Sequence, residues 1–499
     1  MFLKALRDKV CFLVWPKNLN NMKQLLLIYF LFFSIGFFAQ APSRFYTKFG
    51  GNGIDIGYSG KPTLDKQYIV VGSTSSYGAG NTDVYLVKVD SMGFPIWEMF
   101  FGGFNNDVGK SVIQLPDSGY VVAGFTNSFG AGGYDAYIVR TDKKGTLIWQ
   151  KTFGGLDWDF ANDLVLASDG GIIVCGNTSS FGAGKKDGLM LKYDLAGNLL
   201  WQKIIGGIEN EELRSVIKTN DNLLASVGLT QSKGDVNGDC YFVKFDLNGD
   251  TLFTKYFGGP GKDHANDIVQ KPNSDYFICG AKTYSTNPKT ESLMYSMSSN
   301  GGFIMENHYY ASSTDEEFVS LSNSFQLTSL TAYLRTVPVP NFKMEGNIFL
   351  ATPLGYYYKI NSFCGFEDEI LFSVEGTSDG GFLCVGSTLS FNSIGEDVFM
   401  IKLDSTVITY SSVVGIKEKT KNQKTSIFYE ENDNIKIVFQ DEEIAQEVMI
   451  YDLNGKRLKQ FIPKETQIKI DITDLSPSVY LLMVKYISGK VYYSKVIRR

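Results

Sequence analysis

Short apolar runs follow one another along most of the chain, and turns rich in Gly, Asp, Asn and Ser separate them. Residues 111–153 are typical, because they contain the runs SVIQLP, GYVVAGFT, DAYIVRT and TLIWQKTF. β-Branched and aromatic residues are frequent in these runs, and runs of this kind predict strands. The sequences DSG at residues 117–119 and DKKG at residues 142–145 predict tight turns, since Asp starts such turns and Gly accepts a positive φ. The segment therefore predicts four antiparallel strands.

This pattern recurs every 52 residues. The period is set by paired glycines that begin at Gly50, Gly102, Gly154, Gly206 and Gly258. Another glycine keeps the same phase at Gly72, Gly124, Gly176, Gly228 and Gly280. Two more divergent units follow, which makes seven units between about residues 49 and 414. A repeat of four antiparallel strands predicts a propeller blade. The expected fold class is therefore all-β, with a seven-bladed β-propeller of four-stranded blades over residues 42–414.

The two ends of the repeat region predict how the ring closes. Residues 44–49 (RFYTKF) align with the fourth strand of a unit, although no first three strands precede them. The seventh unit has three clear strands and then a weak continuation at residues 406–414. The simplest interpretation is that the N-terminal strand completes the last blade. The alternative is that residues 406–414 supply the fourth strand.

One acidic residue stands in phase in every unit. The set is Asp55, Asp107, Asp159, Glu211, Asp263, Asp315 and Glu369. Carboxylates gathered near the axis of a ring could hold a cation such as Ca²⁺. The alternative is that each carboxylate accepts hydrogen bonds from the backbone of its own loop or ties it to the neighbouring blade. A residue that recurs in every unit usually serves the unit, so the sequence favours the structural role.

Two connections in each unit carry the recurring motifs S-x-G-A-G-x-x-D and G-G-x-x-x-(D/E). They are the loop between the second and third strands and the loop between blades. Because strand direction alternates within a blade, both loops emerge on the same face, which we call the loop-rich face. The opposite face has only tight turns. A glycan or protein ligand is therefore expected on the loop-rich face or at the channel mouth beside it.

Other candidate chemistry is sparse. Residues 235–239 (DVNGD) resemble the start of a calcium loop, but they lack the bidentate glutamate further on. The chain has two histidines, His264 and His308. His264 follows Asp263, but no nucleophile or third catalytic partner is in view, so we expect a solvated loop histidine. The sequence thus predicts no catalytic residue and no firm metal or cofactor site.

The N-terminal segment and the charge restrict the compartment and the partners. Residues 24–39 form an apolar run of 16 residues preceded by Met22 and Lys23. The run is short for a membrane span and suits a signal peptide, so residues 1–41 are expected to be removed, with Met22 as the true start and no transmembrane anchor. The net charge of −6 is acidic, which argues against nucleic acid as a partner.

Five cysteines remain after the expected cleavage, and their spacing fits no metal site. Cys175, Cys279 and Cys384 lie in apolar strand runs, where a thiol behaves as a small hydrophobic group. These three are expected in the core. A bridge between Cys364 and Cys384 stays open.

The blade ends have the form D-x-x-G-x-x-x-W, as in residues 90–97, 142–149 and 194–201. This motif resembles the tryptophan motif of quinoprotein dehydrogenases, in which the resemblance implies a Trp packed between blades. The predicted blade count is one short of that family, and an adjacent-cysteine cofactor motif is lacking. More broadly, residues 72–93 resemble the propeller repeats of secreted bacterial proteins, which implies the fold more firmly than an activity.

From residue 415 the composition changes. Residues 415–425 form a charged linker, and alternating runs over residues 426–499 predict a small Ig-like β-sandwich. The runs VMIYDLNGK and IDITDL, the residues VYLL and the terminal KVIRR resemble the type A C-terminal sorting domain of type IX secretion in Bacteroidetes. The matching positions include Tyr451, Asp452, Gly455, Lys456, Asp471, Leu475, Tyr480 and Lys495.

That resemblance implies export through the periplasm and the type IX machinery, followed by release or attachment to the cell surface. Two departures are present: Pro477-Ser478-Val479 replaces the usual glycine, and the proline-rich opening near Ile427 is missing. We therefore expect a secreted or surface-attached propeller scaffold for interaction or adhesion. The alternatives are an extracellular enzyme on a propeller scaffold, either quinoprotein-like or acting on polysaccharide, and a purely structural surface protein.

Overall fold

The structure is a computed structural model, and every element that it describes is a strand. In the repeat region it describes residues 44–284, 287–309, 317–323, 331–338, 344–351, 357–363, 368–390, 393 and 395–404. Further along it describes residues 426–430, 434–438, 445–451, 457–463, 465, 467–475, 478–486 and 491–498. Within these ranges no helix is long and apolar enough to cross a membrane. The expected signal peptide, the linker and Asp315 lie outside the described residues.

The strands β1–β28 form seven antiparallel four-stranded sheets, which we number as blades one to seven. Blades one to three contain β2 (Asp55–Pro62), β3 (Tyr68–Thr74), β4 (Asp83–Val89), β5 (Pro95–Phe101); β6 (Asp107–Gln114), β7 (Tyr120–Thr126), β8 (Asp135–Thr141), β9 (Leu147–Phe153); β10 (Asp159–Leu166), β11 (Ile172–Thr178), β12 (Asp187–Tyr193) and β13 (Leu199–Ile205). Blades four and five contain β14 (Glu211–Lys218), β15 (Leu224–Thr230), β16 (Asp239–Phe245), β17 (Thr251–Phe257); β18 (His264–Gln270), β19 (Tyr276–Tyr284), β20 (Asn287–Met297) and β21 (Phe303–Tyr309). Blades six and seven contain β22 (Glu317–Asn323), β23 (Thr331–Pro338), β24 (Met344–Ala351), β25 (Tyr357–Phe363); β26 (Glu369–Gly376), β27 (Phe382–Thr388), β28 (Asp397–Leu403) and β1 (Phe45–Phe49).

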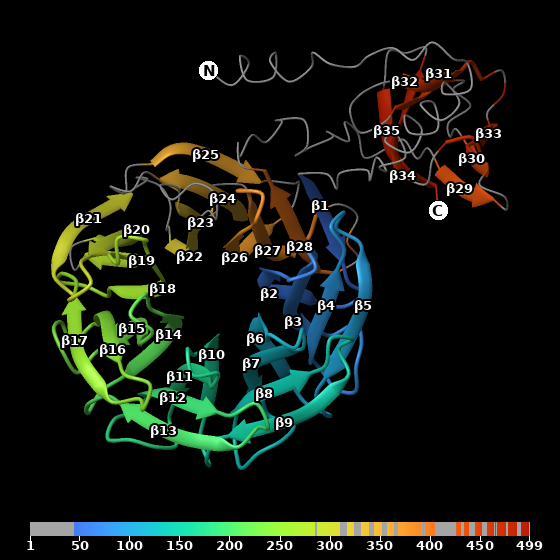
Figure 1. The fold of residues 1–499 in the computed structure, drawn as a ribbon. Helices are drawn as coiled ribbons and strands as arrows, with labels where there is room; N and C mark the ends of the chain where they lie inside the picture. Colours follow the sequence, from blue (N-terminus) through green and yellow to red (C-terminus); the bar gives the residue numbers. More distant parts are fainter. Residues whose placement is uncertain are drawn as a thin grey trace, which may run out of the picture.

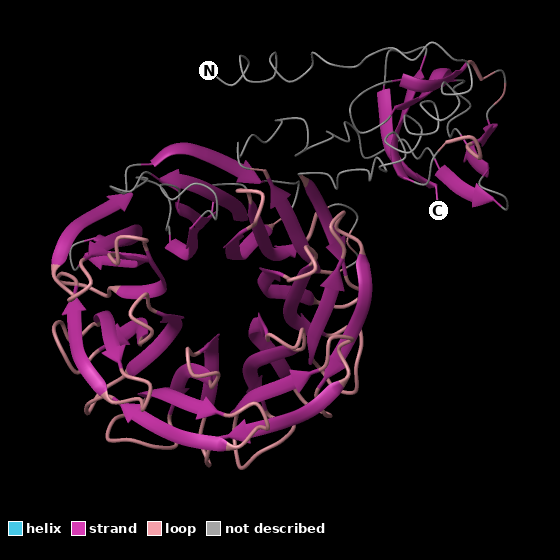
Figure 2. Cartoon of the chain, viewed as in Figure 1, coloured by secondary structure: helices cyan, strands magenta, loops and turns pink. Residues whose placement is uncertain are grey.

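The seven sheets are arranged in a ring around a central axis (Figure 1). The first strand of each blade is the innermost, and it contacts the first strand of the next blade all the way from β2 to β26 and back to β2. The same view coloured by secondary structure shows strands throughout the ring (Figure 2). The all-β, propeller-like fold expected from the repeat is therefore confirmed.

The N-terminal strand closes the ring. β1 pairs antiparallel with β28, in the register Phe45↔Lys402 to Phe49↔Val398. The Lys48 ammonium lies 2.6 Å from the Asp397 carboxylate, and Arg44 forms a second ion pair with Asp404. Strands that come from the two ends of the repeat region therefore share one sheet, as the alignment of residues 44–49 predicts.

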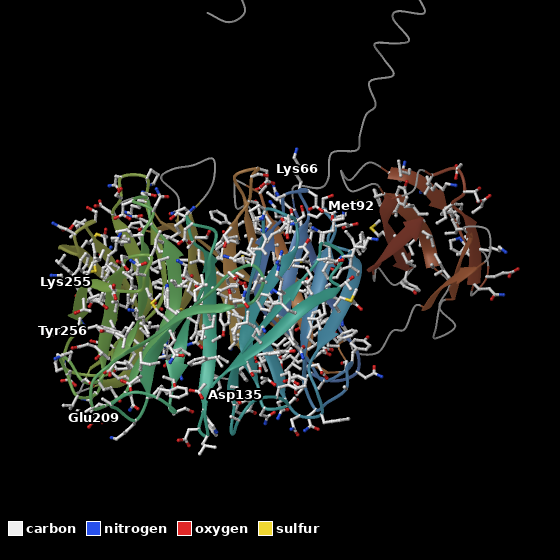
Figure 3. All side chains as sticks on the ribbon, turned by 60° about the horizontal axis from the view of Figure 1, so that its bottom comes forward. Lys66, Met92, Asp135, Glu209, Lys255 and Tyr256 are labelled. Carbon is white, nitrogen blue, oxygen red and sulfur yellow. The ribbon has the colours of Figure 1, made fainter. Side chains whose placement is uncertain are left out.

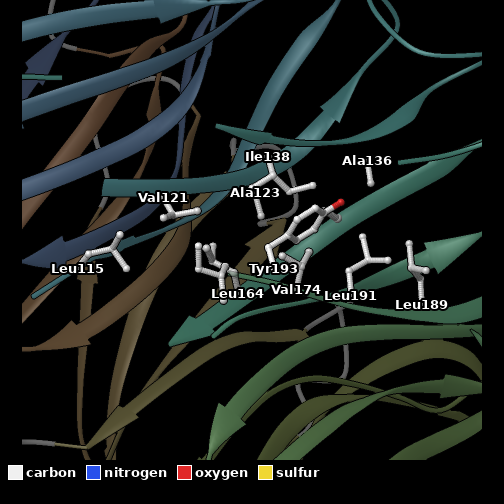
Figure 4. Close-up of a cluster of buried hydrophobic side chains, with 12 residues drawn as sticks. Leu115, Val121, Ala123, Ala136, Ile138, Leu164, Val174, Leu189, Leu191 and Tyr193 are labelled. Atoms are coloured by element: carbon white, nitrogen blue, oxygen red, sulfur yellow. The ribbon is translucent and has the colours of Figure 1, made fainter. Parts of the chain in front are cut away.

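Hydrophobic layers between neighbouring blades form the core. The second and third strands of a blade are buried along almost their whole length, whereas the fourth strand is largely exposed. One such layer joins Val121 and Ile138 of blade two to Leu164, Val174 and Leu191 of blade three (Figure 4). Each buried residue of this size removes apolar surface from water, which contributes about 1.5–3 kcal/mol. The blades are thus held together by packing of sheet on sheet.

The tryptophans of the blade ends pack between blades. Trp149 donates a hydrogen bond from Nε1 to the carbonyl oxygen of Leu195 in the next blade, at 3.1 Å. Its ring faces the turn glycine Gly197 of that blade, whose φ is +83°. Trp201 makes the corresponding bond to Leu247 at 3.2 Å. The packing role implied by the resemblance to the tryptophan motif is present here.

Every innermost strand carries a β-bulge at the same place, for example between Ala161 and Asp163 in β10. The bulge brings the carbonyl oxygen of Phe160 to within 1.8 Å of the point where a Cβ of Gly176 would lie. Only glycine fits there, because any side chain would collide with the backbone. The same contact recurs at Gly72, Gly124, Gly228, Gly280 and Gly386. In these six blades the close carbonyl contact therefore requires the second glycine of the repeat, whereas the bulge of blade six pairs Phe318 with Arg335 at this position.

The buried cysteines carry free thiols. They are Cys175, Cys240, Cys279 and Cys384. The core positions expected for three of them are confirmed. The bridge between Cys364 and Cys384 is not formed, since Cys384 is a free thiol packed among apolar residues of blade seven.

The C-terminal strands form two further sheets. One contains β29 (Ser426–Glu430), β30 (Asn434–Val438) and β33 (Gln467–Asp471), and the other contains β32 (Arg457–Phe461), β31 (Ala445–Tyr451), β34 (Ser478–Tyr486) and β35 (Val491–Arg498). Ile437 and Ile470 of the first sheet share one buried cluster with Val448, Ile450 and Leu482 of the second. The two sheets thus pack as the predicted sandwich.

We expect Gly176→Ala to destabilise the ring by about 3 kcal/mol or more, because its Cβ would overlap a backbone carbonyl that cannot move without breaking the bulge. Urea unfolding followed by tryptophan fluorescence would measure the loss. Gly302→Ala is the matched control, since the nearest atom to its Cβ is the hydroxyl of Ser298, a side chain that can rotate. Equal losses in both variants would contradict the role assigned to the bulge.

Candidate functional site

The in-phase acidic residues lie at or beside the starts of the innermost strands and bind their own loops. The Asp107 carboxylate accepts a hydrogen bond from Gly103 N at 2.8 Å and another from Ser128 Oγ at 2.6 Å. Gly103 belongs to the loop between blades and Ser128 to the loop between the second and third strands. Equivalent bonds reach Asp55, Asp159 and Glu211, and a backbone bond from the paired glycines reaches Asp263. Each of these carboxylates therefore ties two loops together, which is the structural role that the sequence favours.

A second in-phase carboxylate faces the first across each of five blade junctions. Asp83 Oδ1 and Asp107 Oδ2 both lie within 2.4 Å of the point where a Cβ of Gly102 would stand. The corresponding pairs are Asp397 with Asp55, Asp135 with Asp159, Asp187 with Glu211, and Asp239 with Asp263. The first glycine of each pair is required because it separates two carboxylates with no room for a side chain.

Burial of these paired carboxylates raises several of their pKa values. Burial is the main cause for Asp83, and the neighbouring charge of Asp107 adds to it. The pKa values of Asp135 and Asp187 rise for the same two reasons. Burial raises the pKa of Asp263 to about 6.

A metal role for the acidic set stays a prediction. Among the residues that the structure describes, no three His, Cys, Asp or Glu side chains come together in a group suited to a metal ion. Glu369 accepts a hydrogen bond from Thr388 Oγ1 at 2.8 Å, and Asp315 lies outside the described residues. In the calcium-like loop, Asp235 accepts from Asn237 N at 2.8 Å and Asp239 accepts from Asp235 N at 2.8 Å. These contacts close the loop on itself.

The loop-rich face and the tight-turn face lie at opposite ends of the ring. Lys66 and Met92, in the tight turns, lie at one end, and Asp135 and Glu209 lie at the other (Figure 3). The loop-rich face also exposes apolar side chains that follow the paired glycines: Phe104 is 86% exposed, Leu156 84% and Ile208 76%. Exposed apolar groups gathered on one face are typical of interaction surfaces.

The bulges of the innermost strands place one unmatched residue per blade at the channel. These bulged residues are Tyr58, Lys110, Asn162, Arg214, Asn266, Val319 and Phe372. Their chemistry differs from blade to blade, whereas the residue that follows each bulge is always Ser or Asp. Bulges are frequent beside functional sites because they re-aim a side chain. We call these seven residues the axial set.

One side of the axial set is aromatic. The rings of Tyr58 and Phe372 lie 5.1 Å apart between their centroids. The Lys110 ammonium lies 3.8 Å from the centroid of the Tyr58 ring, which is a cation–π contact. Burial lowers the pKa of Lys110 to about 8.

The other side of the axial set is polar. The Arg214 guanidinium donates from Nη1 to Asn266 Oδ1 at 2.6 Å, and its Nη2 lies 3.4 Å from the Glu212 carboxylate. Asn162 donates to the carbonyl oxygen of Leu213 at 2.8 Å. His264 Nε2 lies 2.7 Å from Glu317 Oε1, so an ion pair or hydrogen bond joins blades five and six.

His264 corrects an expectation. Its side chain is only 12% exposed and it begins β18, so it is not a solvated loop histidine. Within the described residues its Nδ1 is buried without a hydrogen-bond partner. The pKa of Glu317 is about 2, because hydrogen bonds and charge from His264 outweigh the opposing effect of burial.

A pocket of about 290 Å³ opens beside this polar side of the axial set. It is lined by Lys186, Asn210, Glu212, Arg214, Gln231 and Lys262, with Leu229 as the apolar wall. Glu212 has a lowered pKa because the charges of Arg214 and Lys186 outweigh its burial. The pocket therefore holds three cations and one carboxylate.

The preceding blade fills the equivalent positions with aromatic rings. Tyr134, Trp158 and Phe160 stand 52 residues before Lys186, Asn210 and Glu212. The centroids of Tyr134 and Trp158 lie 5.9 Å apart, and those of Tyr134 and Phe160 lie 5.8 Å apart. Trp158 is 58% exposed. The same structural positions thus form an aromatic cluster in one blade junction and a charged pocket in the next.

The sequence predicted the loop-rich face but not the individual residues of this site, although a signal for them was present. The sixth unit is one of the two more divergent units, and its loops lie largely outside the described residues. Comparison of the residue just before each conserved Ser or Asp of the first strand would have revealed the axial set. The departure from symmetry lies in those positions, where six residue types occur in seven blades.

Several residues of the expected sorting motif lie in the C-terminal sandwich. Tyr451 ends β31, Asp471 ends β33 and accepts from Thr473 N at 2.8 Å, and Leu475 packs against the core. Tyr480 is buried in the core. Asp452, Gly455 and Lys456 lie outside the described residues. Lys495 lies in β35 opposite Leu481, and its side chain is not described.

Residues 431–498 match the secretion system C-terminal sorting domain. The match lies on the strands and residues that carry the resemblance seen in the sequence. The sorting domain indicates that the chain is exported by type IX secretion, as a secreted or cell-surface protein.

The chain is also similar, at a lower level, to a curated protein. A segment of 202 residues is 27% identical to the regulatory protein FlaEY of Caulobacter vibrioides, which covers 34% of this chain and 21% of that protein. The chain therefore spans about a fifth of the length of this relative.

Solved structures with a similar fold are distant. Sqt1 of Chaetomium thermophilum is 12% identical with a TM-score of 0.42, over 90% of this chain and 97% of that chain. Puromycin hydrolase is 11% identical with a TM-score of 0.42, over 90% of this chain and 61% of that chain. A glucose dehydrogenase is 9% identical with a TM-score of 0.36, over 58% and 94% of the two chains.

The raised pKa values predict a stability that increases as the pH falls from about 7.5 to 5.5. Burial raises the pKa of Asp263 and of Asp267 to about 6, above about 3.9 in an unfolded chain. The folded state therefore takes up protons first, so the cost of the buried charge is relieved on acidification. Below about pH 4 the trend reverses, because the ion pair with Lys402 lowers the pKa of Asp379 despite burial.

Differential scanning fluorimetry across this pH range would measure the effect. We expect the melting temperature to rise by about 2 °C or more between pH 7.5 and 5.5, and Asp267→Asn to reduce that rise. Asp250→Asn, which removes an exposed carboxylate paired with Lys203 on the outer strands, is the matched control. A rise that Asp267→Asn leaves unchanged would contradict the assignment.

Proposed function

We propose that the ring is an extracellular binding module for interaction or adhesion, and that its ligand site is the pocket and axial set on the loop-rich face. The observation that supports this most is the break in repeat symmetry at the channel. The position after each bulge is always Ser or Asp, whereas the axial set and the pocket change from aromatic to charged residues between blades. Side chains freed from the structural repeat, on a rigid scaffold, are typical of binding sites.

The contacts of the acidic loops support a rigid face. Because four of the in-phase carboxylates each join a loop between blades to a loop within a blade, the loop-rich face is tied together at these units, which are those of Asp55, Asp107, Asp159 and Glu211. A preformed rim lowers the entropy lost on binding.

The charge states at the pocket favour binding over acid–base catalysis. The pKa values of Glu212 and Glu317 are both lowered, so both are ionised at neutral pH and neither could donate a proton. The His264 and Glu317 contact is a link between blades. We therefore place the interaction scaffold before the enzyme alternative.

The C-terminal sorting domain indicates the compartment in which the ring would bind its ligand. Export by type IX secretion places the ring outside the cell, with the secretion machinery as its first partner. We propose a bacterial source among the Bacteroidetes, an N-terminal signal peptide over residues 1–41, and release or surface attachment after export.

We expect deletion of residues 431–498 to reduce the amount of the protein outside the cell at least tenfold and to leave it in the periplasm. Immunoblots of periplasm, outer membrane and medium from a host with type IX secretion would measure this. A reporter that carries a signal peptide and residues 415–499 is the converse control, and we expect it to be exported. Unchanged export after the deletion would contradict the sorting role.

We expect Arg214→Ala to weaken ligand binding about tenfold or more, since hydrogen bonds to a charged group contribute about 1.5–3 kcal/mol. A glycan array and a surface-protein binding screen, probed with the secreted protein, would find the ligand and compare the variants. Lys203→Ala, on the outer strand β13, is the matched control. If Lys66→Ala on the tight-turn face abolished binding while Arg214→Ala did not, the proposed site would be wrong.

A further inference from the structure

The pocket, which is lined by residues of blades three and four and by Lys262 just before blade five, has an unbalanced charge. Lys186, Arg214 and Lys262 line it together with a single carboxylate, Glu212. Among the described residues, the ammonium groups of Lys186 and Lys262 have no ion pair or hydrogen bond with another side chain, and both side chains are at least partly exposed. The nearby Lys185 is different, because it is paired with Glu209 at 2.7 Å. The pocket therefore presents unpaired positive charge to an incoming group.

The guanidinium of Arg214 retains donors for a ligand. It makes one short bond, to Asn266, and one long contact, to Glu212 at 3.4 Å. Since a guanidinium has five N–H groups in a planar fork, the remaining donors suit a planar carboxylate. The Asn266 amide is itself fixed, because it donates to the carbonyl oxygen of Phe318 at 2.8 Å. Arg214 is therefore held in place for recognition.

The presence of Glu212 favours a ligand group with a single negative charge. A dianionic phosphate would meet this carboxylate inside the same pocket, and like charges at short range repel. A carboxylate neutralises the excess positive charge with less repulsion. The charge balance therefore indicates a singly charged anion, and the planar guanidinium of Arg214 favours a planar carboxylate among such groups.

The remaining lining suits hydroxyl groups. Asn210 donates to Gln231 at 2.5 Å, and Gln231 donates to the carbonyl oxygen of Asn237 at 3.2 Å. Each amide keeps further donor or acceptor capacity. Leu229 is the one apolar wall among the lining residues, so the pocket offers little to an apolar peptide side chain. Polar groups that converge in this way fit a polyhydroxylated ligand.

An aromatic platform lies at the neighbouring junction on the same face. Trp158 is 58% exposed and is supported by Tyr134 and Phe160. A flat, exposed indole can pack against the apolar face of a sugar ring, while its N–H stays available for a hydroxyl group. A chain of sugars could thus contact Trp158 with one unit and the charged pocket with another.

We propose that the pocket binds a carboxylate-bearing carbohydrate, an oligosaccharide that contains uronic acid. Arg214, Lys186 and Lys262 hold the carboxylate, Asn210 and Gln231 bind hydroxyl groups, and Trp158 packs against a neighbouring sugar. This assignment rests on the proposed binding function and names the ligand class.

Titration calorimetry of the exported full chain with oligogalacturonate tests the assignment. The comparison ligands are its fully methyl-esterified form, a neutral galactose oligosaccharide, a sulfated galactose oligosaccharide and a short polyglutamate peptide. We expect oligogalacturonate to bind at least tenfold more tightly than each of them. We expect Arg214→Ala and Lys262→Ala to weaken it about tenfold, and Trp158→Ala to weaken oligosaccharides more than a single galacturonate.

Lys185→Ala is the matched control, because it removes one positive charge beside the pocket without removing a lining group, and it should leave the affinity within about twofold. Because Lys262 is exposed, its variant stays informative if Arg214→Ala misfolds. Equal binding of the methyl ester, the sulfated sugar or the peptide would overturn the carbohydrate assignment while leaving a binding function in place. A ligand that bound independently of Arg214 and Lys262 would instead overturn the proposed site.

Discussion

The close approach of a backbone carbonyl to a glycine in the second strand is the constraint on which the ring depends. In blade three the bulge of β10 turns the Phe160 carbonyl against Gly176, at a distance that admits no Cβ. Because this contact recurs in six blades, it fixes the register between the first two strands of each of them. The same bulge frees one residue per blade from the ladder and directs it toward the channel. In those six blades the glycine therefore both fixes the register and accommodates the bulge that frees the axial residue.

The paired carboxylates hold the loops in place, and the glycines fix the register of the strands. Five of the blade junctions bring two acidic groups onto one glycine, and burial raises the pKa of several of these groups, so the arrangement costs free energy at neutral pH. That cost is offset by the hydrogen bonds that each carboxylate accepts from backbone N–H and serine hydroxyl groups. These hydrogen bonds therefore stabilise the loops locally, and a substitution in a loop of this face need not disturb the neighbouring blade.

The repeat made most of the fold predictable from the sequence, but it did not indicate which residues form the proposed site. The period, the strand order and the closure by the N-terminal strand could be predicted from residues that recur at the same position of successive units. The role of the acidic residues in their loops could be predicted from the same recurrence. A bulge adds one residue to every unit alike, so it leaves the period unchanged and gives no signal by itself. His264 was misplaced because its partner, Glu317, lies 53 positions away in a divergent unit. The free thiol of Cys384 shows the same limit, since spacing along the chain says little about which side chains meet.

The free-energy cost of burying ionisable groups is concentrated in one part of the ring. Arg214, Glu212, His264 and Glu317 place four ionisable groups around blades four to six, and His264 Nδ1 is buried without a partner among the described residues. Well-packed apolar residues could replace such groups at a lower cost in free energy. Val319 and Phe372, for example, occupy the position of Arg214 in blades six and seven. Violations of local packing rules tend to persist where they serve function. Because this cost falls on Arg214 of the axial set and on the ionisable groups around it, and not on the glycines or carboxylates that recur along the repeat, the physical argument for a binding site is independent of the argument for the fold.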